Sequence, residues 1–352
     1  MIAIVRDFDQ YVSSTNLSVR AVLERLNKTL ELFQLIVEAD KILVGTVTDG
    51  DIRRGLLGGL NLNSPISMVM QRNFLAASES ELSSFENSFS TSSAPVTFLP
   101  ILNERGEISG IMVRKQAAKS IEHALVMAGG FGRRLGERTL NTPKPLLHVG
   151  GRPILDHVIE NLERTGVATI FVSVHFMADQ IIEHLSARTT AVEIRVIHED
   201  EPLGTAGAIG KITETLSSPL LVINGDVITN VDCVAMHDFQ LRHGLDGTIG
   251  VTRYDVDIPF GVVRYAEDGT FAGIQEKPRI SEFVAAGLYY LSPEFLALVP
   301  RDRRMDMPEL LNTGKEIGLR AGLFPIHEYW TDVGRPADLA AADTHHQAGD
   351  PE

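Results

Sequence analysis

The stretch LVMAGGFGRRLGERTLNTPKP, residues 125–145, organises this chain of 352 residues. An apolar run at residues 124–128 leads into Gly-Gly-Phe-Gly at 129–132, and two arginines follow directly. This pattern predicts a buried strand that ends in a glycine-rich turn. Glycine lets backbone N–H groups approach a phosphate chain closely, and Arg and Lys supply positive charge. We therefore expect a nucleoside triphosphate to bind at this turn.

The bulk composition narrows the class of protein. The formal net charge of −14 argues against a partner that is a nucleic acid or an acidic membrane, so an anionic substrate needs a local basic site. Cys233 is the only cysteine, which excludes an internal disulfide, and its apolar neighbours predict a structural role. The chain contains neither a run of 18 apolar residues nor a signal-peptide pattern, so we expect a cytoplasmic protein.

The first third of the chain contains an internal repeat. Residues 33–48 and 98–113 align without gaps at an offset of 65, and each copy predicts two strands joined by a polar turn. Ser18 is expected to cap a helix before the first copy. The serine-rich residues 75–93 predict a poor helix and a mobile loop. A polar joint at 119–123 divides the chain into expected domains 1–120 and 121–352.

Residues 45–52, GTVTDGDI, resemble the signature of CBS domains, which occur as tandem pairs. The resemblance implies a smaller α+β CBS pair in which Thr48 and Asp51 contact the ribose of an adenine nucleotide. Val113 and Gln116 replace these two residues in the second copy, which argues against a second ribose site of this kind. The alternative is that Thr48 and Asp51 only cap a helix. A role in packing or dimerisation is favoured, and a homodimer or larger homo-oligomer stays open.

From residue 123 onward, strand-like and helix-like segments alternate, which predicts an α/β domain with a Rossmann-like, mixed and mostly parallel sheet. Asp226 follows the apolar strand at 220–223, where it could bind magnesium or cap the next helix, and these alternatives are equally supported. Asp332 ends another strand. The neighbours Glu276 and Lys277 also follow a strand, although such a pair is usually solvated surface.

Five motifs in order resemble those of the sugar-1-phosphate nucleotidyltransferases over residues 123–345. They are GGFGRRL with PKP, LGTAG, NGD, EKP and WTDVG, beginning at residues 129, 143, 203, 224, 276 and 330. In that family a sugar-1-phosphate oxygen attacks the α-phosphorus of a nucleoside triphosphate, and pyrophosphate leaves. The resemblance therefore implies an enzyme that positions two polyanions and needs no protein nucleophile.

The resemblance also implies a role for individual residues. Arg134 and Lys144 handle the triphosphate and the leaving group, Lys277 holds the sugar phosphate, and Asp226 and Asp332 hold Mg²⁺. The sugar contacts would be Gly261, Glu276 and Gly287. The nucleotide contacts would be Ala128, Gly129, Gly130, Gly132, Glu199, Glu201, Gly204 and Thr205.

The sequence motifs determine the type of reaction more closely than they determine its two substrates. The LGTAG turn and the acidic stretch before it look most like the guanylyltransferases, which favours GTP over UTP, dTTP or CTP. A carboxylate such as Glu199 or Glu201 can accept two hydrogen bonds from guanine. Mannose-, glucosamine- and heptose-1-phosphate all stay open as acceptors. We expect the activated sugar to serve the synthesis of bacterial surface glycans. The alternative from another class is a catalytically silent, CBS-linked protein that senses nucleotides.

Overall fold

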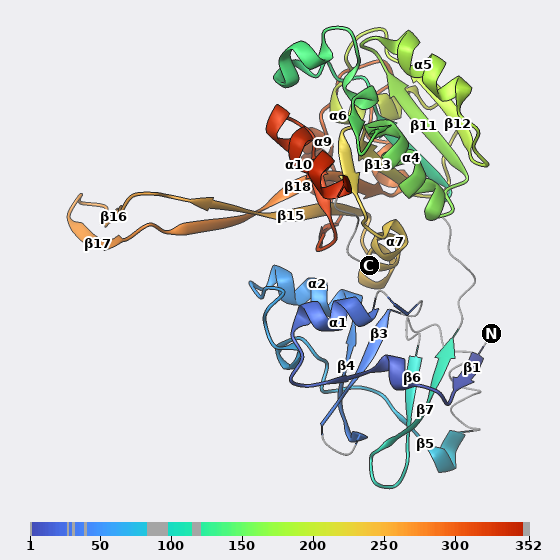
Figure 1. The fold of residues 1–352 in the computed structure, drawn as a ribbon, viewed down its shortest axis with the longest axis vertical. Coiled ribbons are helices and arrows are strands. Elements are labelled where there is room, and N and C mark those ends of the chain that lie inside the picture. Colours follow the sequence, from blue (N-terminus) through green and yellow to red (C-terminus); the bar gives the residue numbers. More distant parts are fainter. Residues whose placement is uncertain are drawn as a thin grey trace. The chain divides into compact units, whose positions relative to one another are not determined.

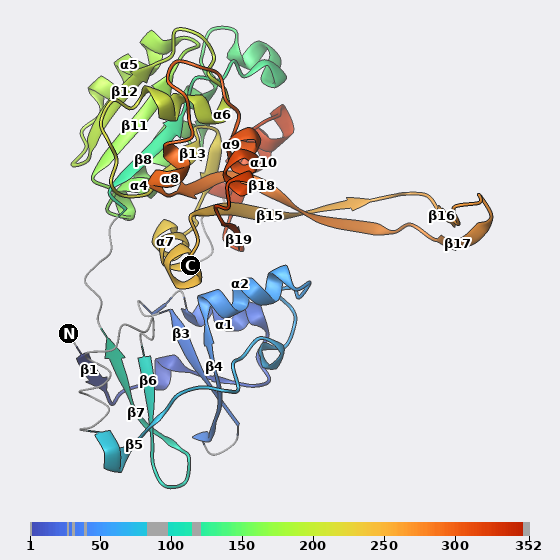
Figure 2. The ribbon, with the colours of Figure 1, turned by 180° about the vertical axis from the view of Figure 1, so that it is seen from behind.

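A computed structural model describes residues 2–26, 28–29, 32–38, 41–82, 98–114 and 121–347. The chain divides into two compact units, Met1–Lys119 and Ser120–Glu352, one residue before the boundary expected from the sequence. Figure 1 shows the fold of each unit, and Figure 2 shows it from behind. None of the helices in the described ranges is long and apolar enough to cross a membrane.

The N-terminal unit contains the repeat that the sequence predicts. The two copies form the strand pairs β3 (Phe33–Val37) with β4 (Leu43–Thr48), and β6 (Phe98–Leu102) with β7 (Ile108–Arg114). Both pairs are antiparallel, and in both the register shifts between the fourth and fifth residues of the first strand. The equivalent rings of Phe33 and Phe98 stack with their centroids 4.0 Å apart. The two copies therefore share one local structure, down to the bulge.

The pairs are completed by short strands and two helices. β2 (Val12–Ser14) joins β3, whereas β1 (Ile2–Val5) and β5 (Ala77–Ser78) flank the second pair. Helix α1 (Val19–Leu26) begins after Ser18, whose hydroxyl accepts a hydrogen bond from the Ala21 N–H at 3.3 Å, as expected. The helix predicted within residues 75–93 lies largely outside the described residues, as does Gln116.

Thr48 and Asp51 form a capping box at the start of α2 (Asp49–Leu57). The Asp51 N–H donates to the Thr48 hydroxyl at 3.2 Å, and the Thr48 N–H donates to the Asp51 carboxylate at 2.8 Å. The other Asp51 oxygen accepts from Arg54 and, at 3.0 Å, from Gln71. The helix-cap interpretation is therefore confirmed, while contact with a ribose stays a prediction.

The C-terminal unit is built on a mixed seven-stranded sheet in the order β12-β11-β8-β13-β18-β15-β19. The strands are β8 (His123–Met127), β11 (Thr169–Val174), β12 (Glu193–His198), β13 (Leu220–Asn224), β15 (Gly247–Asp257), β18 (Arg279–Leu291) and β19 (Ala321–Pro325). Only β18 runs antiparallel to its neighbours. The predicted mixed, mostly parallel α/β sheet is confirmed.

Helices connect and cover these strands. They are α4 (Ile154–Arg164), α5 (Ala178–Ala187), α6 (Gly204–Gly207), α7 (Cys233–His243), α8 (Pro293–Leu296), α9 (Met307–Glu316) and α10 (Pro336–Gln347). Side chains of β8, β13 and β18 pack with Phe295 of α8 and Leu310 of α9 in one buried cluster. Cys233 is fully buried, and burial raises the pKa of its thiol to about 12, which fits a structural cysteine.

Short elements at the carboxyl edge of the sheet complete the unit. They are the 3-10 helices Arg133–Thr139 and Lys144–Leu146, and strands β9 (His148–Val149), β10 (Arg152–Pro153), β14 (Val227–Thr229) and β20 (Trp330–Asp332). β15 and β18 continue as a pair beyond the sheet, and the hairpin of β16 (Val262–Tyr265) and β17 (Phe271–Gln275) lies at their end. We call residues 252–284 the arm, which projects from the body of this unit in Figure 1.

Candidate active site

The glycine-rich turn lies at the carboxyl end of β8, which pairs in parallel with β11 and β13. Ligands of open α/β sheets bind at this edge. Ala128 is buried, and a Cβ atom added to Gly129 would crowd its neighbours at 3.2 Å, whereas Gly130 faces open space. Gly132 has a φ of +64°, and a Cβ atom there would lie 2.9 Å from Thr139. Glycine is therefore required at Gly132, both for its backbone conformation and for space.

Four charged side chains that lie far apart in the sequence meet beside this turn: Arg134, Lys144, Asp226 and Asp332. We call them the charged cluster. The Lys144 ammonium forms a hydrogen-bonded ion pair with Asp226, and its Nζ lies 3.7 Å from Asp332 Oδ1. A Cβ atom added to Gly334 would lie 3.5 Å from the Arg134 guanidinium. The structure thus brings together four residues that the motifs had only placed in order.

Strand pairing explains why the two aspartates approach each other. β14 begins directly after Asp226 and pairs antiparallel with β20, so that Val227 lies opposite Asp332. The Val333 N–H donates to the Asp226 carbonyl oxygen at 3.0 Å. Asp226 is not the cap of the next helix, because Asp232 caps α7 by accepting hydrogen bonds from two backbone N–H groups. The helix-cap alternative for Asp226 is therefore wrong.

The two carboxylates are suited to a divalent cation. Burial raises the pKa of Asp332 and the charge of Asp226 raises it further, while Lys144 and Arg134 lower it. Within the part of the chain that the structure describes, Asp226 Oδ1 and Asp332 Oδ1 are buried and accept no hydrogen bond. Mg²⁺ binds through one or two carboxylates and fills its other positions with water and phosphate oxygens. These orphaned oxygens therefore fit a magnesium ion that a substrate phosphate helps to hold.

Groups of three or more His, Cys, Asp or Glu residues that could hold a metal are absent from the described ranges.

The predicted nucleotide residue Glu199 is buried and holds the backbone of a loop. One of its carboxylate oxygens accepts from the Ser173 hydroxyl, and the other accepts from the Leu203 N–H at 2.8 Å. Thr205 also has two partners, because its N–H donates to Asp306 Oδ1 at 3.1 Å and its hydroxyl accepts from a backbone N–H of α9 at 2.7 Å. Both side chains therefore shape the turn at residues 199–207.

Gly204 and Glu201 belong to the same turn but differ in their surroundings. Gly204 has a φ of +81°, and a Cβ atom there would lie 2.5 Å from Asp306 Oδ1, so a larger residue cannot fit without a shift. Glu201 is exposed, and its carboxylate makes no hydrogen bond or ion pair with another described residue. Its carboxylate, unlike that of Glu199, is accessible to a ligand.

Gly287 and Trp330 bring the base of the arm to the edge of the charged cluster. Gly287 has a φ of +74°, and a Cβ atom on it would lie 2.6 Å from the Asn224 amide nitrogen. The Trp330 indole N–H donates to the Ala286 carbonyl oxygen at 2.8 Å. Asn224 ends β13, two residues before Asp226, and Trp330 begins β20, which ends at Asp332, so these contacts join the arm base to both segments that position the aspartates.

The remaining predicted sugar residues lie on the arm, away from its base. A Cβ atom added to Gly261 would lie 2.9 Å from Glu276 Oε1, so these two residues are neighbours. Lys277 is exposed and has a φ of +43°, an unusual backbone conformation for a residue with a side chain. Neither Glu276 nor Lys277 hydrogen-bonds or ion-pairs with the charged cluster in the described structure.

Sequence reasoning missed three residues that support the site. Asn224 is the first residue of the NGD motif, so the sequence singled it out without assigning it a role. The structure places its side chain beside Gly287. Ser173 and Asp306 have no local signal, because their partners Glu199 and Thr205 are 26 and 101 residues away in the chain. Only the tertiary structure shows these pairs.

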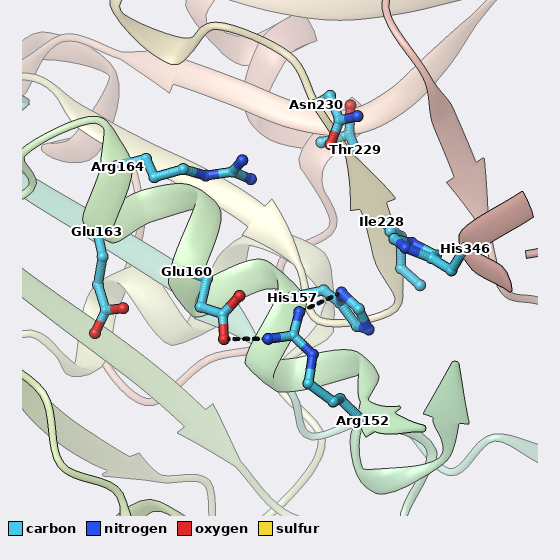
Figure 3. Close-up of a pocket in the computed structure, with 9 residues that line it drawn as sticks. All are labelled: Arg152, His157, Glu160, Glu163, Arg164, Ile228, Thr229, Asn230 and His346. Atoms are coloured by element: carbon cyan, nitrogen blue, oxygen red, sulfur yellow. Dashed lines mark hydrogen bonds and ion pairs between the residues drawn. The ribbon is translucent and has the colours of Figure 1, made fainter. Parts of the chain in front are cut away.

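A cavity of about 510 Å³ lies outside the charged cluster, among α4, β14 and the end of α10 (Figure 3). Arg152 donates to Glu160 at 2.6 Å and contacts His157 Nδ1 at 3.2 Å. Because arginine can only donate, Nδ1 accepts, and the proton of His157 lies on Nε2, which faces the Val149 carbonyl oxygen at 2.9 Å. Arg152 is therefore already paired within this cavity, whose lining contains none of the predicted site residues.

Known proteins are similar to the C-terminal unit. The model of the nucleotidyl transferase family matches residues 123–348. Mannose-1-phosphate guanyltransferase beta-B of Xenopus laevis is 35% identical over 228 residues, which are 61% of this chain and 62% of the relative. The mannose-1-phosphate guanyltransferase of Saccharomyces cerevisiae is 34% identical over 227 residues, with the same shares. The chain thus matches about 62% of the length of these curated relatives.

A solved structure is also similar to part of this chain. The crystal structure of HddC from Yersinia pseudotuberculosis complexed with GMP-PN has a TM-score of 0.52 and 27% identity. The match covers 64% of this chain and 100% of HddC. Because the family model matches residues 123–348, which is more than half of the chain, this chain belongs to the nucleotidyl transferase family.

Proposed function

We propose that the C-terminal unit transfers a nucleoside monophosphate from a nucleoside triphosphate to a sugar-1-phosphate. The observation that carries this proposal is the charged cluster beside the glycine-rich turn, at the carboxyl edge of the sheet. A nonbridging oxygen of the sugar phosphate forms a new bond to the α-phosphorus of the triphosphate. The bond between this phosphorus and the oxygen that links it to the β-phosphorus breaks. The electron pair leaves with pyrophosphate, and no protein group has to accept a proton.

The residues of this chain bind and orient the two anions in this scheme. The backbone of residues 128–132 approaches the triphosphate, and Arg134 and Lys144 donate to its oxygens. Lys144, which bridges the two aspartates here, then exchanges its carboxylate partners for phosphate. Asp226 and Asp332 would hold Mg²⁺, which supplies positive charge to the phosphate oxygens when it is bound. Lys277 and Glu276 stay assigned to the sugar phosphate and a sugar hydroxyl.

For the nucleotide we propose GTP. The supporting observations are the names of the similar mannose-1-phosphate guanyltransferases and the GMP-PN ligand of the similar HddC structure. Glu201 is the better candidate for guanine recognition, because its carboxylate is exposed whereas both oxygens of Glu199 already have partners. The acceptor would then be mannose-1-phosphate or a related sugar-1-phosphate. The reaction would take place in the cytoplasm, and its nucleotide-sugar product would serve the synthesis of surface glycans.

A panel of four triphosphates with several sugar-1-phosphates, read out as released pyrophosphate, tests this function. We expect turnover that needs Mg²⁺, with GTP as the best donor. Preference for UTP, dTTP or CTP would change only the nucleotide assignment. If no pair supports turnover by the wild-type chain, the transferase assignment is wrong and a nucleotide-sensing role replaces it.

For the N-terminal unit we propose a CBS-like pair whose main role is packing or dimerisation. Its support is the matched pair of hairpins and the stacked rings of Phe33 and Phe98. The capping box occupies the Thr48 and Asp51 side chains, which leaves a nucleotide ligand less well supported. Calorimetry of the full chain with AMP and with ATP, repeated with Thr48→Val, tests that ligand. Heat that is lost in the variant would support an adenine nucleotide.

A further inference from the structure

The arm is a two-stranded ribbon that extends past the sheet of the C-terminal unit. β15 pairs with β19 only up to Val251, and β18 pairs with β13 only from Leu288 onward. Between these points and the tip, the two strands pair only with each other among the described residues, as Figures 1 and 2 show. An isolated ribbon is marginally stable in water, and its free edges can pair with another chain.

Large apolar side chains are concentrated on this ribbon. Of the seventeen exposed large hydrophobic residues described in the whole chain, eight lie between residues 254 and 280. The largest exposed fractions are 73% for Phe260, 75% for Tyr265 and 71% for Phe271, all near the tip. Isolated exposed apolar residues are normal, but a concentration on one projecting element marks a surface that binds another protein.

The arm also separates Lys277 from the charged cluster of its own chain. Gly287 lies at that cluster, beside Asn224, and residues 279–291 form one continuous strand. At about 3.3 Å per residue, the ten residues from Gly287 to Lys277 span roughly 33 Å. The Lys277 side chain is far too short to bridge that distance. In this conformation the charged cluster therefore lacks the lysine assigned to the second anion.

We propose that the arm docks on a second copy of this chain, so that each catalytic site receives Lys277 and Glu276 from the partner copy. This inference rests on the proposed function, because it concerns the same site. A reciprocal exchange of identical arms is closed by a two-fold axis and leaves no arm without a site. It would also bury the apolar residues of the tip on the partner.

Two features favour a second copy over an unrelated partner. The arm leaves the sheet at the same edge as the charged cluster, because β13 and β15 both run antiparallel to β18, and the carboxyl end of β15 enters the arm. A compact unit of this size has a radius of roughly 22 Å, so an arm of about 33 Å can reach the site of an adjoining copy. The arm carries residues that are assigned to the site, and it is long enough to reach a neighbouring molecule. The same site in another copy of this chain is therefore the place where we expect the arm to dock.

Complementation between two inactive variants tests the shared site. Asp226→Asn damages the charged cluster, and Lys277→Ala damages the arm, so each variant alone should have low activity. When both are co-expressed with different tags and form random dimers, about a quarter of the sites combine an intact cluster with an intact arm. We expect the mixture to recover about a quarter of the wild-type activity. In the matched control for chain mixing, Asp226→Asn is co-expressed with Lys315→Ala, a variant that replaces an exposed lysine on α9.

The outcomes separate this inference from the proposed function. If the wild-type chain shows no activity with any substrate pair, the function is wrong. If the wild type is active but the co-expressed variants stay at background, each chain uses its own arm and the inference is overturned. Full activity of Lys277→Ala alone would overturn it as well.

The oligomeric state supplies a readout that does not depend on activity. We expect light scattering to show a dimer for the wild type and a shift toward monomer for the double variant Phe260→Asp and Phe271→Asp. Both residues are exposed in a single chain, so their replacement should not disturb its folding. A wild-type chain that is monomeric at assay concentration, with or without substrates, would contradict the exchange of arms.

Discussion

Replacing Lys144 by alanine should destabilise the C-terminal unit, whereas replacing Asp332 by asparagine should not, although both changes should abolish turnover. Lys144 is the cation between two carboxylates, so its loss leaves Asp226 without its ion-pair partner and leaves Arg134 as the remaining cation of the charged cluster. Asp332 is different because burial and Asp226 raise the pKa of its carboxyl. Its ionised form is thus less favourable in the folded state than in the unfolded chain, and asparagine removes that charge.

The expected size follows from the burial of the three side chains. The exposed fraction is 8% for Lys144, 24% for Asp226 and 40% for Asp332. Removing one partner from a fully buried ion pair costs roughly 3–5 kcal/mol, and screening at the partly exposed carboxylates lowers this to about 1–3 kcal/mol. In a unit of this size, a loss of about 2 kcal/mol lowers the Tm by roughly 4–8 °C.

Thermal unfolding in chelator, without substrates, measures this difference. Lys315→Ala removes an exposed lysine and should leave the Tm unchanged. The double variant with Lys144→Ala and Asp332→Asn should recover part of the stability lost in Lys144→Ala, because only one carboxylate then remains. The reasoning fails if Lys144→Ala unfolds at the wild-type temperature, or if Asp332→Asn loses as much stability as Lys144→Ala.

Three further predictions concern the same site. Gly204→Ala should weaken nucleotide binding and cost more than about 1 kcal/mol of stability, because of its positive φ and because Asp306 Oδ1 lies 2.5 Å from the added Cβ. Gly130→Ala, which meets open space, is the control in unfolding, and Lys315→Ala is the control in calorimetry. Mg²⁺ at ten times its dissociation constant should stabilise the wild type by about 1.4 kcal/mol, seen as a higher Tm, and should not stabilise Asp226→Asn; an equal shift in both would reject the metal assignment. Trp330 is the only tryptophan and donates to the arm base, so sugar phosphate should change its fluorescence in the wild type but not in Lys277→Ala.

Much of the fold could be predicted because its signals are local. The strands of the internal repeat were confirmed, and their first residues in the two copies keep the offset of 65, since apolar alternation and turn glycines act over a few positions. The predicted strand at 220–223 was also confirmed. The family suggested by five motifs was confirmed by the family match.

The functional site could be predicted only in part. Chemistry and order in the chain pointed to Lys144, Asp226 and Asp332, but not to the ion pair among them, because that pair depends on the pairing of β14 with β20. The alternatives for Asp226 were equal in the sequence; the capping of α7 by Asp232 rules out the helix-cap alternative, and the magnesium role stays a prediction. The positioning contact between Thr205 and Asp306 had no signal at all.

The sequence by itself determined the local elements, the reactive residue types and the family, because these follow from short-range patterns of glycine, apolar and charged residues. Only the tertiary structure decided which of these residues meet. The glycine-rich turn joins Lys144 and the two aspartates because β8 and β13 are neighbours and β14 pairs with β20. The EKP residues stay apart because β15 and β18 continue past the sheet as an arm. Such contacts depend on strand pairing between distant segments, which no local pattern specifies.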